Sequence, residues 1–202
     1  MKRIVLMALL ALALPLAAFA GSTVDFTNSG GTLTGSNAGL SLTGSEVIKV
    51  EGLGTGALGN DATLSFSTGS YIGTVGAVST FNAGGSFTII GNGINGVPSG
   101  SIFVGSFTTP VTLTGEGSVS GGTQYVVFAH ISGTWYTGQT AVGITNESWV
   151  GSFTTGEDGF MGSSTFGSGD TFLTPTPEPG TLGLLGTGLV GLAGAIRKKF
   201  KA

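Results

Sequence analysis

The chain has 202 residues, of which 39 are Gly, none is Cys and only 8% are charged, with a formal net charge of −3. The lack of Cys excludes a disulfide framework or a thiolate metal site, and the single His excludes an imidazole cluster. The absence of a basic stripe argues against nucleic acid as a partner, and the Gly residues lack the period of collagen. With 40% apolar residues, the chain is expected to fold around a core.

Residues 1–20 have the pattern of a secretory signal peptide. Two basic residues form a positive n-region, and the apolar run 4–13 that follows is too short to span a bilayer as a mature helix. Ala18 and Ala20 place small residues at the two positions that a signal peptidase recognises, so we expect cleavage before Gly21. The alternative is an N-terminal anchor that stays uncleaved.

Residues 21–174 are predicted to form one exported domain, called the ectodomain below. This range contains nine carboxylates and Lys49 alone among the basic residues, a formal net charge of −8. An acidic and sparsely charged domain stays soluble by mild repulsion and does not bind anionic lipid or nucleic acid. It could attract divalent cations.

Apolar and polar residues alternate with a period of two along the ectodomain, for example in 24–27, 40–43 and 64–67, and no helical period is sustained. Turn residues recur at spacings of about 8–12 residues. These patterns predict an all-β fold, a single antiparallel β-sandwich or jelly-roll-like domain of about ten to twelve short strands. A Gly-rich parallel β-helix is the second architecture, but its fixed coil period is missing. The predicted aromatic core consists of Phe26, Phe66, Phe81, Phe87, Phe103, Phe107, Phe128 and Phe153.

The ectodomain has few candidates for chemistry. His130 shares a strand face with Val126 and Phe128, and no nucleophile motif accompanies it, so we interpret it as structural and assign no catalytic residue. Trp135, Tyr136 and Trp149 could form a glycan-contact patch by stacking on sugar rings. Core positions are the favoured interpretation, because adjacent residues of a strand point to opposite faces.

The densest acidic group of the ectodomain is Glu157-Asp158, with Asp170 further along a Gly-rich stretch. Calcium prefers several oxygen ligands, and flexible Gly loops can add carbonyl groups to carboxylates. A calcium site formed by Glu157, Asp158 and Asp170 is therefore one hypothesis, and a solvated hairpin tip is the other. No other metal or cofactor is expected.

Residues 175–202 form a tail with three parts. The Pro-rich segment around Pro177-Glu178-Pro179 is stiff and extended, because each Pro fixes its own φ and restricts the preceding residue. Residues 180–196 carry no charge and predict one transmembrane helix of about 26 Å. The basic end, 197–202, is expected to stay in the cytoplasm. Its charged residues are Arg197, Lys198, Lys199 and Lys201.

This tail resembles the PEP-CTERM sorting signal of exported bacterial proteins. The resemblance rests on Pro177-Glu178-Pro179, the apolar span and the basic end, and it covers only about 28 residues. It implies export across the inner membrane, transient anchoring there by the tail, and processing by an exosortase at or near the motif. An ordinary C-terminal anchor with a Pro-rich stalk is the alternative.

The resemblance, together with the low charge and the lack of reactive groups in the ectodomain, predicts a non-enzymatic cell-surface or extracellular-matrix protein, a structural or adhesive component associated with exopolysaccharide or biofilm. Its expected partners during export are signal peptidase and an exosortase. A carbohydrate- or calcium-binding β-sandwich module is the alternative function. A glycan-acting enzyme that uses the Glu157 and Asp158 carboxylates is a third hypothesis.

Overall fold

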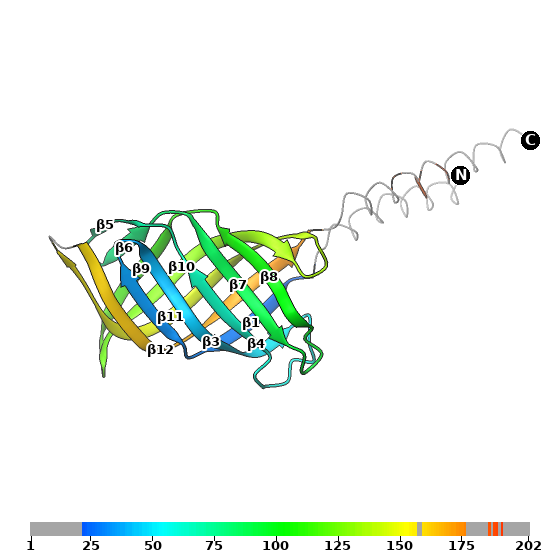
Figure 1. The fold of residues 1–202 in the computed structure, drawn as a ribbon, viewed down its shortest axis with the longest axis horizontal. Helices are drawn as coiled ribbons and strands as arrows, with labels where there is room; N and C mark the ends of the chain where they lie inside the picture. The colour runs from blue at the N-terminus through cyan, green and yellow to red at the C-terminus, as the bar shows by residue number, and fades with distance from the viewer. Residues whose placement is uncertain (1–21, 157–158, 177–185, 187, 190, 192–202) are drawn as a thin grey trace, which may run out of the picture. The chain divides into compact units, whose positions relative to one another are not determined.

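The computed structural model describes residues 22–156 and 159–176, together with the helical residues 186, 188, 189 and 191 (Figure 1). The predicted signal peptide, 1–20, and most of the predicted membrane helix, 180–196, lie outside the described residues. Within the described part of the chain, no helix is long and apolar enough to cross a membrane. Residues Thr23–Thr174 form one compact unit.

The unit is built from β-strands whose buried and less buried residues alternate, as the period of two predicts. In β1, for example, Val24, Phe26 and Asn28 are buried and the residues between them are less so. The strands are β1 (Val24–Ser29), β2 (Thr32–Ser36), β3 (Gly39–Glu51), β4 (Ala62–Ser67), β5 (Tyr71–Val75), β6 (Val78–Phe81), β7 (Gly84–Asn92), β8 (Ser99–Phe107), β9 (Val111–Val119), β10 (Gly122–Trp135), β11 (Thr140–Gly156) and β12 (Gly159–Pro175).

Eight of these strands close into an antiparallel barrel in the order β1-β3-β4-β7-β8-β10-β11-β12 (Figure 1). The barrel closes because β12 pairs with β1 as well as with β11. This seam between the first and last strands runs from Val24, opposite Leu173, to Ser29, opposite Ser168.

The remaining strands extend the wall of the barrel. β2 follows β1 after Gly30 and Gly31, which both have positive φ, and it continues the pairing of β1 with β12 and β3. The long strand β10 pairs with β9 along Gly122–Phe128 and with β8 along Ile131–Trp135. From β9 the sheet continues through β6 to β5, which ends it.

The all-β, antiparallel prediction is confirmed, but the arrangement differs from a two-sheet sandwich or jelly roll. The strands are also longer than predicted, with 17 residues each in β11 and β12. Strands that bend around a common core need inward positions without a side chain. At Gly133 on β10, for example, a Cβ would lie only 2.4 Å from the Cα of Gly105 on β8.

An aromatic cluster fills the barrel. Phe66 lies at its centre, stacked on Phe87 at 5.9 Å and edge-to-face with Phe107 and Trp149. Six of the eight phenylalanines predicted for the core are buried, and Phe153 is partly buried. The prediction for Phe128 is wrong: its side chain is 42% exposed, because Val127, Ala129 and Ile131 are the residues of β10 that face inward.

Candidate functional site

The barrel interior contains a cluster of polar side chains around the buried carboxylate of Glu147 on β11. Asn28 on β1 donates a hydrogen bond from Nδ2 to Glu147 Oε2 at 2.7 Å and a second one to Ser45 Oγ on β3 at 2.8 Å. The hydroxyls of Thr145 and Thr171 donate to Oε1 at 3.1 and 3.5 Å. All five residues are buried. The cluster therefore joins β11, β12, β1 and β3 across the closing seam of the barrel.

Two glycines of β12 make room for the large side chains of β11. A Cβ on Gly169 would lie 2.4 Å from Glu147 Oε2, and a Cβ on Gly167 would lie 2.1 Å from Trp149 Cδ1. Glu147 and Trp149 can therefore lie across β12 toward β1. Sequence reasoning missed Glu147, because nothing in the sequence around it marks this carboxylate as buried.

Burial raises the pKa of Glu147 to about 7, from an ordinary value of 4.5. The hydrogen bonds from Asn28, Thr145 and Thr171 act in the opposite direction by stabilising the carboxylate, and the negative charge of Asp170 adds to the increase. Because Glu147 is fully enclosed, it is out of reach of a substrate. The protonation state of Glu147 therefore affects the free energy of unfolding of the barrel and not a reaction with a substrate.

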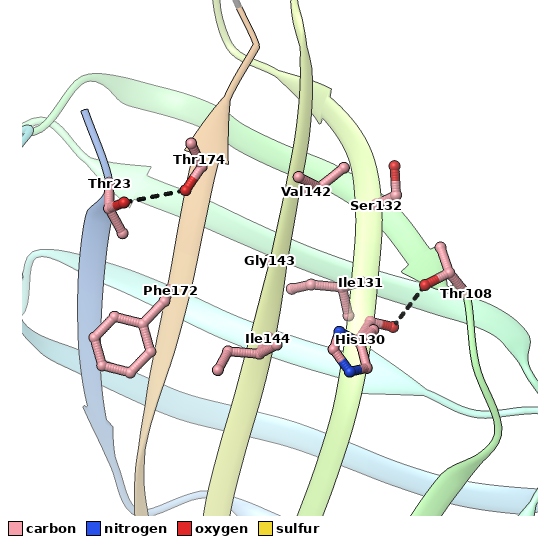
Figure 2. Close-up of a pocket in the computed structure, with 10 residues that line it drawn as sticks. All are labelled: Thr23, Thr108, His130, Ile131, Ser132, Val142, Gly143, Ile144, Phe172 and Thr174. Atoms are coloured by element: carbon pink, nitrogen blue, oxygen red, sulfur yellow. Dashed lines mark hydrogen bonds between the residues drawn. The ribbon is translucent and has the colours of Figure 1, made fainter. Parts of the chain in front are cut away.

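A shallow hollow of about 660 Å³ lies on the outer wall of the barrel, over β10, β11 and β12 (Figure 2). Phe172, Ile144 and His130 lie in a row across these three strands, and His130 pairs directly with Ile144. Hydroxyl groups lie near both ends of the row: Thr23 Oγ1 and Thr174 Oγ1, 3.1 Å apart, are near Phe172, and Ser132 and Thr108 are near His130. The lining contains no Asp, Glu, Lys or Arg side chain.

A second, smaller cavity of about 260 Å³ lies between the β5–β6 and β9–β10 hairpins and the β11 and β12 strands. Tyr125, Phe153 and Phe160 are among its lining residues. Phe153 contacts Tyr125 edge-to-face at 4.9 Å and stacks on Phe160 at 5.4 Å, and Phe160 also packs against Tyr71 and Phe81. Hydroxyl groups also line it, among them Thr74 Oγ1 and Ser79 Oγ, which are 2.7 Å apart. These aromatic rings therefore have a structural role, because they pack the end of the barrel.

The acidic residues predicted to bind calcium are only partly described. Glu157 and Asp158 lie outside the described residues, and Asp170 is eleven residues along β12 from Gly159. Asp170 accepts a hydrogen bond from Thr27 Oγ1 at 2.9 Å. Partial burial, followed by the charges of Asp170 and Glu51, raises the pKa of Asp25 nearby. Among the described residues, no group of three or more His, Asp or Glu side chains is arranged to hold a metal ion. The calcium site stays a prediction.

The structure also places the aromatic and imidazole candidates. Trp135 and Trp149 are buried and Tyr136 is exposed, as expected if at least one of the adjacent pair is a core residue. His130 is exposed on the outer wall, where its ring contacts that of Phe128 edge-to-face at 5.6 Å. Neither tryptophan can form a stacking surface for a sugar. Phe128 and Phe172 are exposed on the strands of the wall, in addition to Tyr136.

The residues predicted to direct sorting lie beyond the ectodomain, and Pro177, Glu178 and Pro179 are outside the described part of the chain. Residues 175–198 match the family model of the PEP-CTERM protein-sorting motif. The chain carries a PEP-CTERM sorting signal. The matched range contains Pro177-Glu178-Pro179 as well as Arg197 and Lys198. No curated protein and no solved structure matches the chain.

PEP-CTERM signals are recognised by an exosortase, so this finding identifies an exported protein that passes through a membrane-associated sorting system to the cell surface. The matched segment begins at Pro175, the last residue of β12. The barrel strands are therefore complete before the Pro-Glu-Pro motif begins at Pro177.

Proposed function

We propose that the protein is a structural or adhesive component of the cell surface or extracellular matrix, released from a transient membrane anchor by an exosortase and associated with exopolysaccharide. The PEP-CTERM signal is the observation that carries this proposal. The closed barrel supports it, because a wall rich in Ser and Thr around a packed core suits a durable external protein. The ectodomain acts without catalysis in this proposal, since its buried carboxylate at Glu147 is enclosed and His130 lies on an aromatic and aliphatic wall.

The intact mass of the protein recovered from the envelope and medium of the exporting host tests this proposal. We expect a species that begins at Gly21 and ends near Pro177-Glu178-Pro179, with any additional mass at the new C-terminus identifying the final anchor. Replacing these three motif residues by Ala should leave a species that still contains residues 180–202. A wild-type mass that includes 180–202 would instead indicate an ordinary membrane-tethered protein.

The outer hollow favours a second function, the direct binding of a neutral carbohydrate. Its volume of about 660 Å³ falls within the range of about 300–1,000 Å³ that is usual for small-molecule sites. Phe172, which is 37% exposed, offers a ring to the apolar face of a sugar, and the hydroxyls of Thr23, Thr174 and Ser132 can hydrogen-bond to its edge. The lack of carboxylates and lysines in the lining suits a ligand without charge.

Substituting Phe172 by Ala tests the hollow as a carbohydrate site. We expect retardation of the protein in gels that contain neutral polysaccharide, and at least about a tenfold loss of this affinity in Phe172→Ala. Phe128→Ala is the matched control, because Phe128 is similarly exposed on the wall but does not line the hollow. Tryptophan fluorescence is unsuitable as a direct reporter, since both indoles are buried. An equal effect of the two substitutions would contradict the assignment.

A further inference from the structure

Three loops, called the proximal loops below, lie at the end of the barrel where β12, drawn in orange, finishes (Figure 1). They connect β3 to β4 (52–61), β7 to β8 (93–98) and β10 to β11 (136–139). A Cβ on Gly52 would lie 2.7 Å from the carbonyl oxygen of Thr23, whose hydroxyl is 3.1 Å from that of Thr174 near the end of β12. The Thr55 N–H donates to the Asn95 carbonyl at 2.8 Å and so joins the first two loops.

Each proximal loop exposes a large apolar or aromatic side chain. Leu58 is 77% exposed on the first loop, and Ile94 and Tyr136 are each 43% exposed on the other two. The loops contain no Lys, Arg, His or Glu, and their one carboxylate, Asp61, is buried and accepts a hydrogen bond from Asn95 Nδ2 at 2.7 Å. Exposed apolar groups that lie together on a soluble domain mark a site of interaction with a membrane or a protein.

The course of the chain identifies which of these this end of the barrel faces before processing. β12 ends at Pro175, and the uncharged run 180–196, predicted to span the membrane, begins five Cα-to-Cα steps later. Five such steps reach at most about 18 Å. On the transient anchor of the proposed function, on which this inference rests, the end of β12 is therefore held close to a bilayer. A short tether also gives the proximal loops a high effective concentration at the lipid, so that a weak contact is sufficient.

The charge of the ectodomain restricts the kind of lipid contact. Its formal net charge is −8, so anionic headgroups repel it as a whole. Apart from Asp61, the carboxylates and the lysine that the structure describes in the ectodomain lie on strands, and Glu51, the last residue of β3, forms an ion pair with Lys49. The proximal loops thus offer apolar side chains without a charge of either sign. They suit the boundary between headgroups and acyl chains, where Tyr is also favoured.

We infer that the proximal loops rest on the lipid bilayer while the sorting tail is still attached, with Leu58 and Ile94 in the interfacial layer. This contact holds the end of β12 at the membrane surface. The Pro-Glu-Pro motif begins two residues after the end of β12, so it is presented where a membrane-associated exosortase acts. Cleavage removes the tether, and the weak contact of the loops alone then releases the barrel.

A fluorescent label on a single introduced cysteine tests this contact, because the chain has no Cys of its own. The unprocessed chain, 21–202, is reconstituted in phosphatidylcholine vesicles with the environment-sensitive label nitrobenzoxadiazole on Leu58→Cys. We expect a blue-shifted emission that is lost when the vesicles contain nitroxide-labelled lipid. Ala38→Cys is the matched control, because Ala38 is exposed in the β2–β3 turn, next to Asn37, which accepts from the Phe160 N–H near the start of β12. The label at this opposite end should keep the emission it has in water.

The outcomes separate this inference from the proposed function. An unprocessed chain that does not float with the vesicles would contradict the membrane anchor itself. A chain that floats while its label at position 58 stays in water, or is quenched no more than the label at position 38, would overturn the inference alone. In the exporting host, Leu58→Asp should slow the removal of residues 180–202, whereas Val75→Asp, at an apolar position of β5 that is 85% exposed, should not. Equal rates in these two variants would show that the loops have no part in presenting the motif.

Discussion

Replacing Glu147 by Gln should remove most of the pH dependence of the ectodomain's stability between about pH 5 and about pH 8. Burial raises the pKa of this carboxyl to about 7 in the folded protein, from 4.5 in the unfolded chain. The folded state therefore holds a proton that the unfolded state releases, and stability falls as the pH rises through this interval. The shift corresponds to about 3 kcal/mol of unfolding free energy, greatest below pH 4.5 and lost above pH 7.

Urea unfolding at about pH 5 and about pH 8 measures this effect. Wild type should be less stable at the higher pH, whereas Glu147→Gln should be nearly independent of pH, because the amide retains an oxygen that can accept from Asn28 without carrying a charge. At the higher pH the variant should be the more stable protein. Glu46→Gln, at an exposed position of β3, is the control and should keep the wild-type slope. An unchanged slope in Glu147→Gln would show that the carboxyl does not carry the proton.

Replacing Phe66 by Ala should destabilise the barrel by about 3–5 kcal/mol, the usual cost of removing a fully packed phenyl ring. Phe66 is buried and touches three other rings of the central cluster, those of Phe87, Phe107 and Trp149. The substitution leaves a cavity that these neighbours, held on separate strands, can fill only in part. A loss of this size is a large share of the stability of about 5–15 kcal/mol that is typical of a folded domain.

The matched comparison is Phe128→Ala, which deletes the same group from the outer wall. Its effect on the urea midpoint should correspond to about 1 kcal/mol or less, because Phe128 is 42% exposed. The sequence pattern predicted both phenylalanines for the core, so comparing the two substitutions tests directly which of them lies inside the barrel. Similar losses for the two substitutions would contradict the observed orientation of β10.

Local patterns were enough to predict the strands but not their closure. Alternation placed Phe26, Leu42 and Leu64 on inward faces correctly, because a period of two is a property of each strand alone. The prediction for Phe128 was wrong because β10 has apolar residues on both faces, and alternation alone does not show which face points inward. The pairing of β1 with β12 joins residues almost 150 positions apart, and no local signal in either strand specifies it. Two packed sheets were therefore as consistent with the pattern as one closed barrel.

For the candidate sites too, sequence patterns predicted only what is contiguous along the chain. The sorting signal was predictable because its motif, apolar span and basic end are contiguous in sequence. The interior cluster was not, because Asn28, Ser45, Glu147 and Thr171 come from four strands and meet only after closure. Gly167 and Gly169 lie in a Gly-rich stretch in which no local signal distinguishes them, and in the structure they leave space for the side chains of Trp149 and Glu147. The outer hollow likewise depends on which strands become neighbours.

The seam between β1 and β12 has a consequence for the order of events during export. A chain that crosses the membrane from its N-terminus presents β1 first, but the partner of β1 across the seam arrives last. The barrel cannot close until residue 173 has crossed, and contacts of such long sequence separation form slowly. The sorting tail begins two residues later, at Pro175. A tail that delays release would thus keep the chain at the membrane during the interval in which its barrel is still completing itself.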